Sequence, residues 1–171
     1  MLMLIRQFVS IIALPGVVTV AVPVWIARRN HVTFARPHDL ASMAAVLGGM
    51  ALLIVGVLLF ASSLFYFWSR GRGTLAPWDP PRCFVAEGPY RFVRNPMISG
   101  VIFVLLAEAC FFHSLPLAEW AGLVVLINMV YIPVLEEPQL VVRFGEPYLR
   151  YKKAVRRFLP RLHPWKQNDR Q

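Results

Sequence analysis

The sequence predicts an all-α membrane protein, a helical bundle of about four membrane spans followed by a basic amphipathic helix at the cytosolic face. Of its 171 residues, 57% are hydrophobic and only 16% are charged. The apolar residues occur in blocks longer than the elements of a soluble core. A spanning helix needs about 20 apolar residues to cross a hydrocarbon layer of roughly 30 Å. We therefore expect a single membrane domain over residues 1–171.

The N-terminal part, residues 1–69, contains two predicted spans. No charged residue occurs from Phe8 to Ile26 or from Leu40 to Ser69. A cleaved signal peptide is the alternative for the first segment, because Arg6 precedes it. The segment is long for such a signal and no clear cleavage site follows it, so we predict a membrane anchor.

Two further spans are predicted to form a tight helical hairpin over residues 97–135. They run from Met97 to Leu115 and from Pro116 to Leu135, and the link between them is short. The first carries Glu108, which is either a carboxyl group turned into the bundle or a functional group. Both interpretations are open at the level of sequence.

Positive charges predict which parts of the chain face the cytosol. Nine of the eighteen Lys and Arg residues follow Glu137, and five more lie between the second and third spans. Lys and Arg are concentrated in cytosolic loops, so residues 70–96 and 136–171 are expected there, on one side of the hairpin. Arg28, Arg29 and Arg36 would then lie outside, against this rule. With so much lipid-facing sequence, the net charge of +9 indicates attraction to anionic membrane lipids rather than to nucleic acid.

The C-terminal part is predicted to contain a basic amphipathic helix. Pro147 suits the first turn of a helix, and apolar residues then recur at helical spacing as far as Leu159, between basic residues. We expect this helix to lie at the cytosolic interface and to end at Pro160. The cysteines and histidines lack the spacing of a disulfide framework or of metal ligands, so no metal site is predicted.

Glu136 and Glu137 follow the last predicted span, on the same side of the hairpin as Arg91, Arg94 and Asn95. Adjacent carboxylates at a membrane edge repel each other, and partial desolvation increases the cost, so they need cations. They either form a structural network with arginines or bind a zwitterionic ligand. In the second case a glutamate meets the ligand's ammonium group, while an arginine and Asn95 meet its carboxylate.

The segments GPYRFVRNPMISG (88–100) and EEPQLVVRFGEPYLRYKKAVRRFLP (136–160) carry a resemblance. Together with the intervening hairpin, the chain resembles the isoprenylcysteine carboxyl methyltransferase and phospholipid methyltransferase family of integral membrane enzymes. The family pattern is G-P-Y-R-x-x-R-H-P-x-Y-x-G, an apolar stretch, E-E-x-x-L-x-x-x-F-G-x-x-Y-x-x-Y and R-F-I-P. The resemblance implies a helical membrane fold that binds S-adenosylmethionine and methylates a lipophilic acceptor, either a prenylcysteine-type carboxylate or a lipid amine.

The resemblance also implies a set of site residues. Glu136, Glu137 and Arg157 are the candidate catalytic residues, although Arg157 equally suits an anionic lipid. For Gly100, close helix packing is an alternative to a cofactor contact. The cofactor-binding candidates are Tyr90, Arg91, Arg94, Asn95, Pro96, Gly100, Glu136 and Glu137.

Two positions depart from the family pattern. Asn95 stands where histidine is usual, and Ile98 stands where tyrosine is usual. Asparagine can donate a hydrogen bond to a carboxylate, but it cannot act as a base near neutral pH. A carboxylate acceptor needs no base, whereas an amine must first lose a proton. The departures therefore mildly favour a carboxylate acceptor, although Glu136 or Glu137 could take a proton.

Two other functions are open. A nicotinamide-dependent membrane reductase of the steroid-reductase kind has a similar basic C-terminal region, but its larger ligand needs more phosphate-binding surface. A non-catalytic membrane protein, whose basic tail binds lipid or a partner, is compatible with the departures at Asn95 and Ile98. A retained pocket for S-adenosylmethionine would argue against that alternative, and a pocket filled by side chains would support it.

Overall fold

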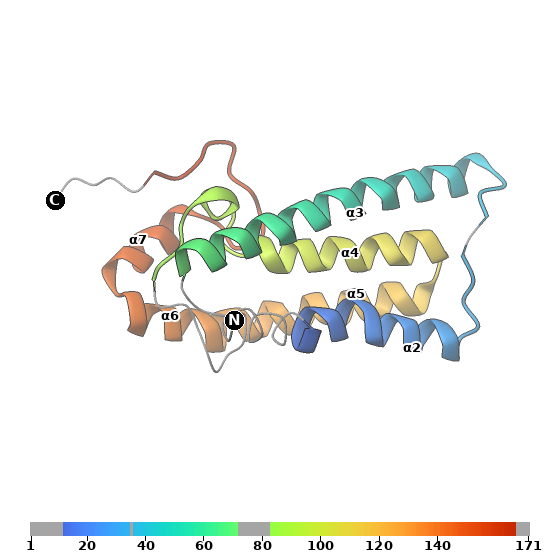
Figure 1. The fold of residues 1–171 in the computed structure, drawn as a ribbon, viewed down its shortest axis with the longest axis horizontal. Helices are drawn as coiled ribbons and strands as arrows, with labels where there is room; N and C mark the ends of the chain where they lie inside the picture. Colours follow the sequence, from blue (N-terminus) through green and yellow to red (C-terminus); the bar gives the residue numbers. More distant parts are fainter. Residues whose placement is uncertain (1–11, 35, 72–82, 167–171) are drawn as a thin grey trace.

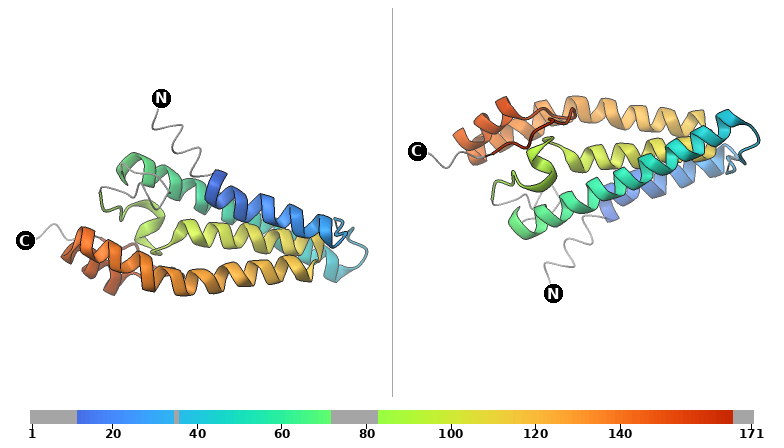
Figure 2. Two further views of the ribbon diagram at one scale, coloured as in Figure 1. Left: turned by 90° about the horizontal axis from the view of Figure 1, so that it is seen from below. Right: turned by 90° about the horizontal axis from the view of Figure 1, so that it is seen from above.

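The computed structural model describes residues 12–34, 36–71 and 83–166, and all regular secondary structure in these ranges is helical. The predicted all-α class is thus confirmed for the described residues. Four α-helices lie side by side along the long axis of the molecule (Figures 1 and 2). These are α2 (Val22–Arg29), α3 (Leu40–Tyr66), α4 (Pro96–Phe112) and α5 (Leu115–Tyr131).

Two continuous helices are long and apolar enough to cross a membrane. Leu40–Gly71 has a mean hydropathy of 2.6, and Leu115–Phe144 has one of 1.8. Only 11% and 22% of their most apolar windows are buried, whereas the core helix of a soluble protein would be mostly buried. Their exposed apolar surfaces therefore suit lipid, and α4 is a shorter apolar helix beside them.

The predicted first span begins outside the described residues. From Ile12 the chain is helical, first as the π-helical η1 (Ile12–Ala21) and then as α2. Pro15 lies inside η1, where the wider turn accommodates a residue that has no backbone N–H. The indole N–H of Trp120 in α5 donates to the Val18 carbonyl oxygen at 3.0 Å and so ties this segment to the bundle.

Helices α4 and α5 are antiparallel neighbours joined by a two-residue turn. His113 ends α4 in the left-handed conformation, with φ of 43°, and the Ser114 side chain accepts a hydrogen bond from the Leu117 amide. The turn comes slightly earlier than the sequence predicted. Its shortness places the start of α4 and the far end of the α5 helix at the same end of the bundle (Figure 1).

The expected end of the last span at Leu135 is wrong. The helix continues through the π-helical η4 (Ile132–Glu136) into α6 (Glu137–Phe144). Pro133 and Pro138 lie inside this continuous helix, and the π-helical turn of η4 accommodates the missing backbone N–H of proline. Glu136 and Glu137 therefore project from a continuous helix rather than from a loop.

The expected extent of the basic C-terminal helix is also wrong. Helix α7 (Glu146–Ala154) has Pro147 in its first turn, as predicted, but it ends well before Pro160. Val155 is already extended, with φ of −112° and ψ of 127°. Beyond it, backbone carbonyl groups bond to a distant segment of the chain, so tertiary hydrogen bonds replace the helical ones.

Helices α3 and α4 pack with their backbones in contact. The buried face of α3 consists of small residues at seven-residue spacing, namely Ser42, Gly49, Gly56 and Ser63. A Cβ atom at Gly56 would lie 2.9 Å from the Gly100 carbonyl oxygen, and one at Gly100 would lie 2.7 Å from the Gly56 carbonyl oxygen. Only glycine permits this approach, so Gly100 has the packing role that was one of its two predicted alternatives.

We expect Gly56→Ala to destabilise the protein by about 1–3 kcal/mol, because backbone atoms cannot move away from the new methyl group. Gly48→Ala is the matched control in the same helix, since a Cβ atom there meets nothing within 4 Å. The measurement is the unfolding temperature of the detergent-solubilised protein, followed by circular dichroism. Equal shifts for the two variants would show that the contact between α3 and α4 is not tight.

Candidate functional site

Polar residues from four segments meet at one end of the bundle. The segments are the 3₁₀ turn η3 (Gly88–Arg91) with the residues leading into α4, the α6 start, α7, and residues 155–166 (Figure 1). Gly88 begins η3 with φ of +55°, and a Cβ atom there would overlap the Tyr66 ring. Glycine is therefore required both by the backbone conformation and by the packing of this turn against the end of α3.

Backbone hydrogen bonds join the segment before α4 to the segment after α7. The amides of Arg94 and Asn95 donate to the carbonyl oxygens of Arg156 and Arg157, at 2.9 and 3.2 Å. Two further bonds of 2.9 Å run in the other direction, from the amides of Arg161 and Trp165 to the carbonyl oxygens of Phe92 and Arg91. Backbone hydrogen bonds thus join residues 91–95 to residues 156–165, which are far apart in the sequence.

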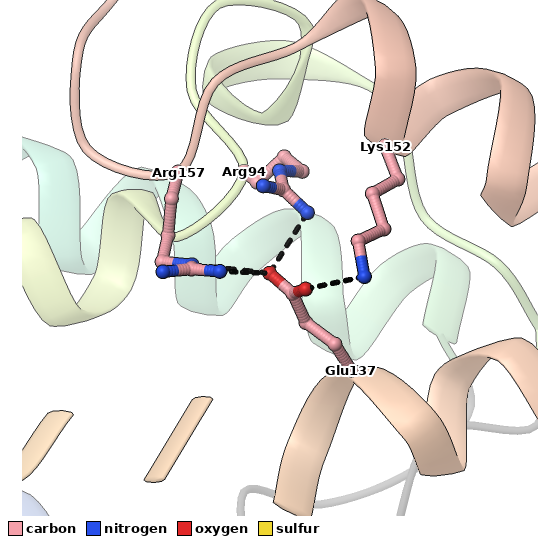
Figure 3. A network of polar contacts seen from close by, with 4 residues as sticks. All are labelled: Arg94, Glu137, Lys152 and Arg157. Atoms are coloured by element: carbon pink, nitrogen blue, oxygen red, sulfur yellow. Dashed lines mark hydrogen bonds and ion pairs between the residues drawn. The ribbon is translucent and has the colours of Figure 1, made fainter. Parts of the chain in front are cut away.

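Glu137 is the centre of the polar cluster (Figure 3). Its Oε1 accepts from Arg94 Nη1 at 2.8 Å and from Arg157 Nε and Nη2, both at 3.0 Å. Its Oε2 lies 2.7 Å from Lys152 Nζ. The single carboxylate therefore binds cations from three separate segments.

The burial of this network explains why it needs so many cations. The side chains of Glu137 and Arg94 are 3% and 10% exposed, so both charges have lost most of their hydration. Arg157 and Lys152 are more exposed, at 27% and 38%, and connect the buried pair to solvent. Glu137 thus has the structural ion-pair role that was one of the two interpretations of the adjacent glutamates.

Glu136 is in a different situation from its neighbour. It is half-buried, and its charge lies close enough to interact with Tyr90, Glu137 and Arg157. Among the residues that the structure describes, none forms a hydrogen bond or ion pair with it. Of the two carboxylates, Glu136 is therefore the one that can still accept hydrogen bonds from a ligand.

Two buried donors at the entrance to α4 also lack a partner within the described part of the chain. They are Arg94 Nε and Asn95 Nδ2, on adjacent residues at the entrance to α4. A buried polar group without a partner costs about 1–3 kcal/mol, which a ligand oxygen would recover. Glu108 Oε2 is likewise buried without a partner among the described residues, but it lies near the C-terminal end of α4, away from the cluster.

A group of buried aromatic side chains lies next to the polar cluster. Tyr148, Tyr151 and Val155 form a buried group with Phe84 and Trp165 packed against it. The Tyr151 hydroxyl donates to the Tyr90 carbonyl oxygen at 2.7 Å. Burial raises the pKa of Tyr148 to about 12 and raises the pKa of Tyr151 well above its usual value, so both phenols stay neutral at physiological pH.

Three other predicted site residues, Arg91, Pro96 and Gly100, have structural roles. The Arg91 Nε donates to the Trp165 carbonyl oxygen at 2.8 Å, so its guanidinium group anchors the C-terminal segment. Pro96 is buried at the start of α4, and Gly100 faces α3. Lys152 was missed by the sequence analysis, which placed it on the polar face of an interfacial helix. No local pattern distinguishes it from neighbouring lysines and arginines.

Comparison with known families identifies the class of protein. Residues 43–147, more than half of the chain, match the family model described as phospholipid methyltransferase. The chain belongs to the phospholipid methyltransferase family. Its apolar helices agree with a membrane methyltransferase that acts on lipids. The family match includes the segment before α4 and both glutamates, whereas Lys152 and Arg157 lie beyond it. Neither a curated protein nor a solved structure matches the chain.

We expect Glu137→Gln to lower the stability of the protein by about 3–5 kcal/mol, because it leaves the buried Arg94 guanidinium without its counter-ion. Glu146→Gln is the matched control, since its pairing with Arg150 at 3.2 Å is exposed and should contribute less than about 1 kcal/mol. Chemical unfolding in detergent micelles, followed by tryptophan fluorescence, measures both variants. A difference below about 1 kcal/mol between them would contradict the central role of Glu137.

Tyr151→Phe removes one buried hydroxyl donor without changing the ring. We expect a loss of about 1–2 kcal/mol, because the Tyr90 carbonyl oxygen loses its partner inside the aromatic group. Tyr131→Phe, at a side chain that is 40% exposed, is the control and should be close to neutral. The same unfolding experiment measures both variants. Equal unfolding free energies for Tyr151→Phe and Tyr131→Phe would show that this hydrogen bond does not contribute to stability.

Proposed function

We propose that the protein is an S-adenosylmethionine-dependent methyltransferase that methylates a lipophilic acceptor at the cytosolic face of a four-span bundle. The family membership supports the methyltransferase class. The observation that carries the cofactor assignment is the pair of buried, unpartnered donors on Arg94 and Asn95, together with the uncommitted carboxylate of Glu136. Arg94 binds Glu137, Asn95 follows Arg94 in the chain, and the charge of Glu136 interacts with those of Glu137 and Arg157.

These groups match the amino-acid end of S-adenosylmethionine. Glu136 would accept hydrogen bonds from the ammonium group, while Arg94 Nε and Asn95 Nδ2 would donate to the carboxylate. Glu137 already binds three cations, so we assign it a positioning role: it holds Arg94 and Arg157 in place. The two adjacent glutamates thus have different tasks, in place of the shared contact implied by the family pattern.

The transfer itself requires little from the protein. Bound S-adenosylmethionine would supply an electrophilic methyl group to an oxygen or nitrogen nucleophile, and the electron pair of the broken carbon–sulfur bond would stay on sulfur. The chain's residues align the acceptor and exclude water. Asn95 cannot remove a proton from the acceptor. The raised pKa of Tyr148 keeps its phenol protonated, so this side chain is not available as a base. Glu136 is the residue here that could take a proton from an amine acceptor.

The placement of the site suits both reactants. The loops around Arg94 and Arg157 carry most of the positive charge, which favours the cytosolic side. The apolar surfaces of α3 and η4 beside the cluster are exposed, for example at Phe65 and Val134, which are 58% and 62% exposed. A lipid acceptor would approach along these surfaces, while the cofactor would enter from the cytosol.

Calorimetric titration of the detergent-purified protein with S-adenosylmethionine and S-adenosylhomocysteine tests the proposal. We expect saturable binding by the wild type and at least tenfold weaker binding by Glu136→Gln, because a charge-assisted hydrogen bond is lost. Glu119→Gln is the matched control, since Glu119 is exposed in α5 near the other end of the bundle. Its affinity should equal that of the wild type.

Absence of binding by folded wild-type protein would contradict the proposal. The Glu137 network would then be a purely structural feature, as in the non-catalytic alternative.

With binding established, transfer of a labelled methyl group to phosphatidylethanolamine or to a prenylcysteine decides between an amine and a carboxylate acceptor. No observation in the structure favours the reductase alternative.

A further inference from the structure

A second group of basic residues lies at the opposite end of the bundle from Glu137. Here α2 ends, α3 begins, and the turn between α4 and α5 reverses the chain (Figure 1). Two adjoining hollows open at this end and share Thr33 in their walls. The first is also lined by Arg28 and His31, and the second by Phe34, Arg36, His38 and His113.

The walls of these hollows contain two arginines and three histidines, and no acidic residue. The nearest acid in the sequence is Asp39, whose carboxylate caps α3 by accepting from the Ser42 amide at 2.8 Å and lies close enough to interact with His38 and His113. Thr33 adds a hydroxyl group to the cationic walls. A site of this composition suits an anion with several acceptor oxygens, of which phosphate is the usual biological example.

Two of the histidines occupy backbone positions that disfavour an ordinary side chain. His31 and His113 have φ of 50° and 43°, and they are the only non-glycine residues with positive φ in the described ranges. His113 comes directly after α4, whereas His31 follows Asn30, the C-cap residue of α2; glycine would be the least strained choice at both positions. Strained positions held by functional side chains are typical of binding sites.

Exposed aromatic residues beside these hollows suit the depth of lipid headgroups. Trp25 is 58% exposed on α2, and the Arg29 guanidinium lies 5.4 Å from its ring centroid. Phe34 is 56% exposed and packs against Phe111 and Phe112, with centroid distances of 6.1 and 6.0 Å. Exposed aromatic side chains beside basic ones are characteristic of the membrane–water interface.

We propose that the hollows form a phosphate-binding site at the membrane face opposite the candidate methyl-transfer site, with Arg28 and Arg36 as the principal cations. The phosphate belongs to a lipid headgroup or to a free phosphate ion. The site explains why arginines lie at an end of the bundle where positive charge is otherwise disfavoured. It does not depend on the proposed function, because its residues are remote from Glu136 and Glu137.

Binding of short-chain phosphatidic acid to the full-length protein in neutral detergent tests this site. We expect saturable binding that weakens at least tenfold in the double variant Arg28→Gln, Arg36→Gln. The control is Lys153→Gln, Lys166→Gln, which removes the same charge from exposed positions at the other end and should leave affinity unchanged. Equal weakening in both variants, or no binding by wild type, would overturn the proposal.

A second variant keeps the test decisive if the double variant does not fold. His113→Asn retains a residue that tolerates positive φ but removes one wall of the site, and severalfold weaker binding is expected at an unchanged unfolding temperature. Unchanged affinity would count against the site. Titration with inorganic phosphate identifies the source of the ligand: competition with phosphatidic acid indicates a free-phosphate site, and its absence indicates a lipid headgroup.

Discussion

The buried carboxylate of Glu137 is the interaction on which the site end of the molecule depends. It binds Arg94 from before α4, Lys152 from α7 and Arg157 from beyond α7, and so fixes three segments at one point. A carboxylate on a side chain that is only 3% exposed is tolerated only with such partners. The same network orients Arg94, whose Nε has no partner among the described residues and can donate a hydrogen bond to a ligand. Stability and ligand binding are therefore coupled through one residue.

The contact between α3 and α4 provides the rigid support for this network. Because Gly56 and Gly100 allow the backbones to touch, α4 is held directly against the longest helix of the bundle. The entrance to α4 carries Arg94 and Asn95, and Gly88 just before it fits against the Tyr66 ring at the end of α3. Close helix packing thus determines where the polar groups meet.

The two ends of the bundle have different chemistry. At one end, acidic residues are surrounded by cations, and the groups without partners are suited to a zwitterion. At the other end, the lining of the hollows around Thr33 includes two arginines and three histidines, which suits an anion. The exposed apolar helices between them give a lipid access to either end. Family membership concerns the first end, whereas the second is an inference from this chain's own residues.

The sequence by itself determined the helical class, the α4–α5 hairpin and the membership of the phospholipid methyltransferase family, because hydropathy and fixed motif spacing are local properties. It did not determine the end of α7, where hydrogen bonds to Arg94 and Asn95 compete with helix formation. Nor did it separate Glu136 from Glu137 or reveal Lys152. These depend on which groups a buried carboxylate meets across the fold, and only the tertiary structure decides that.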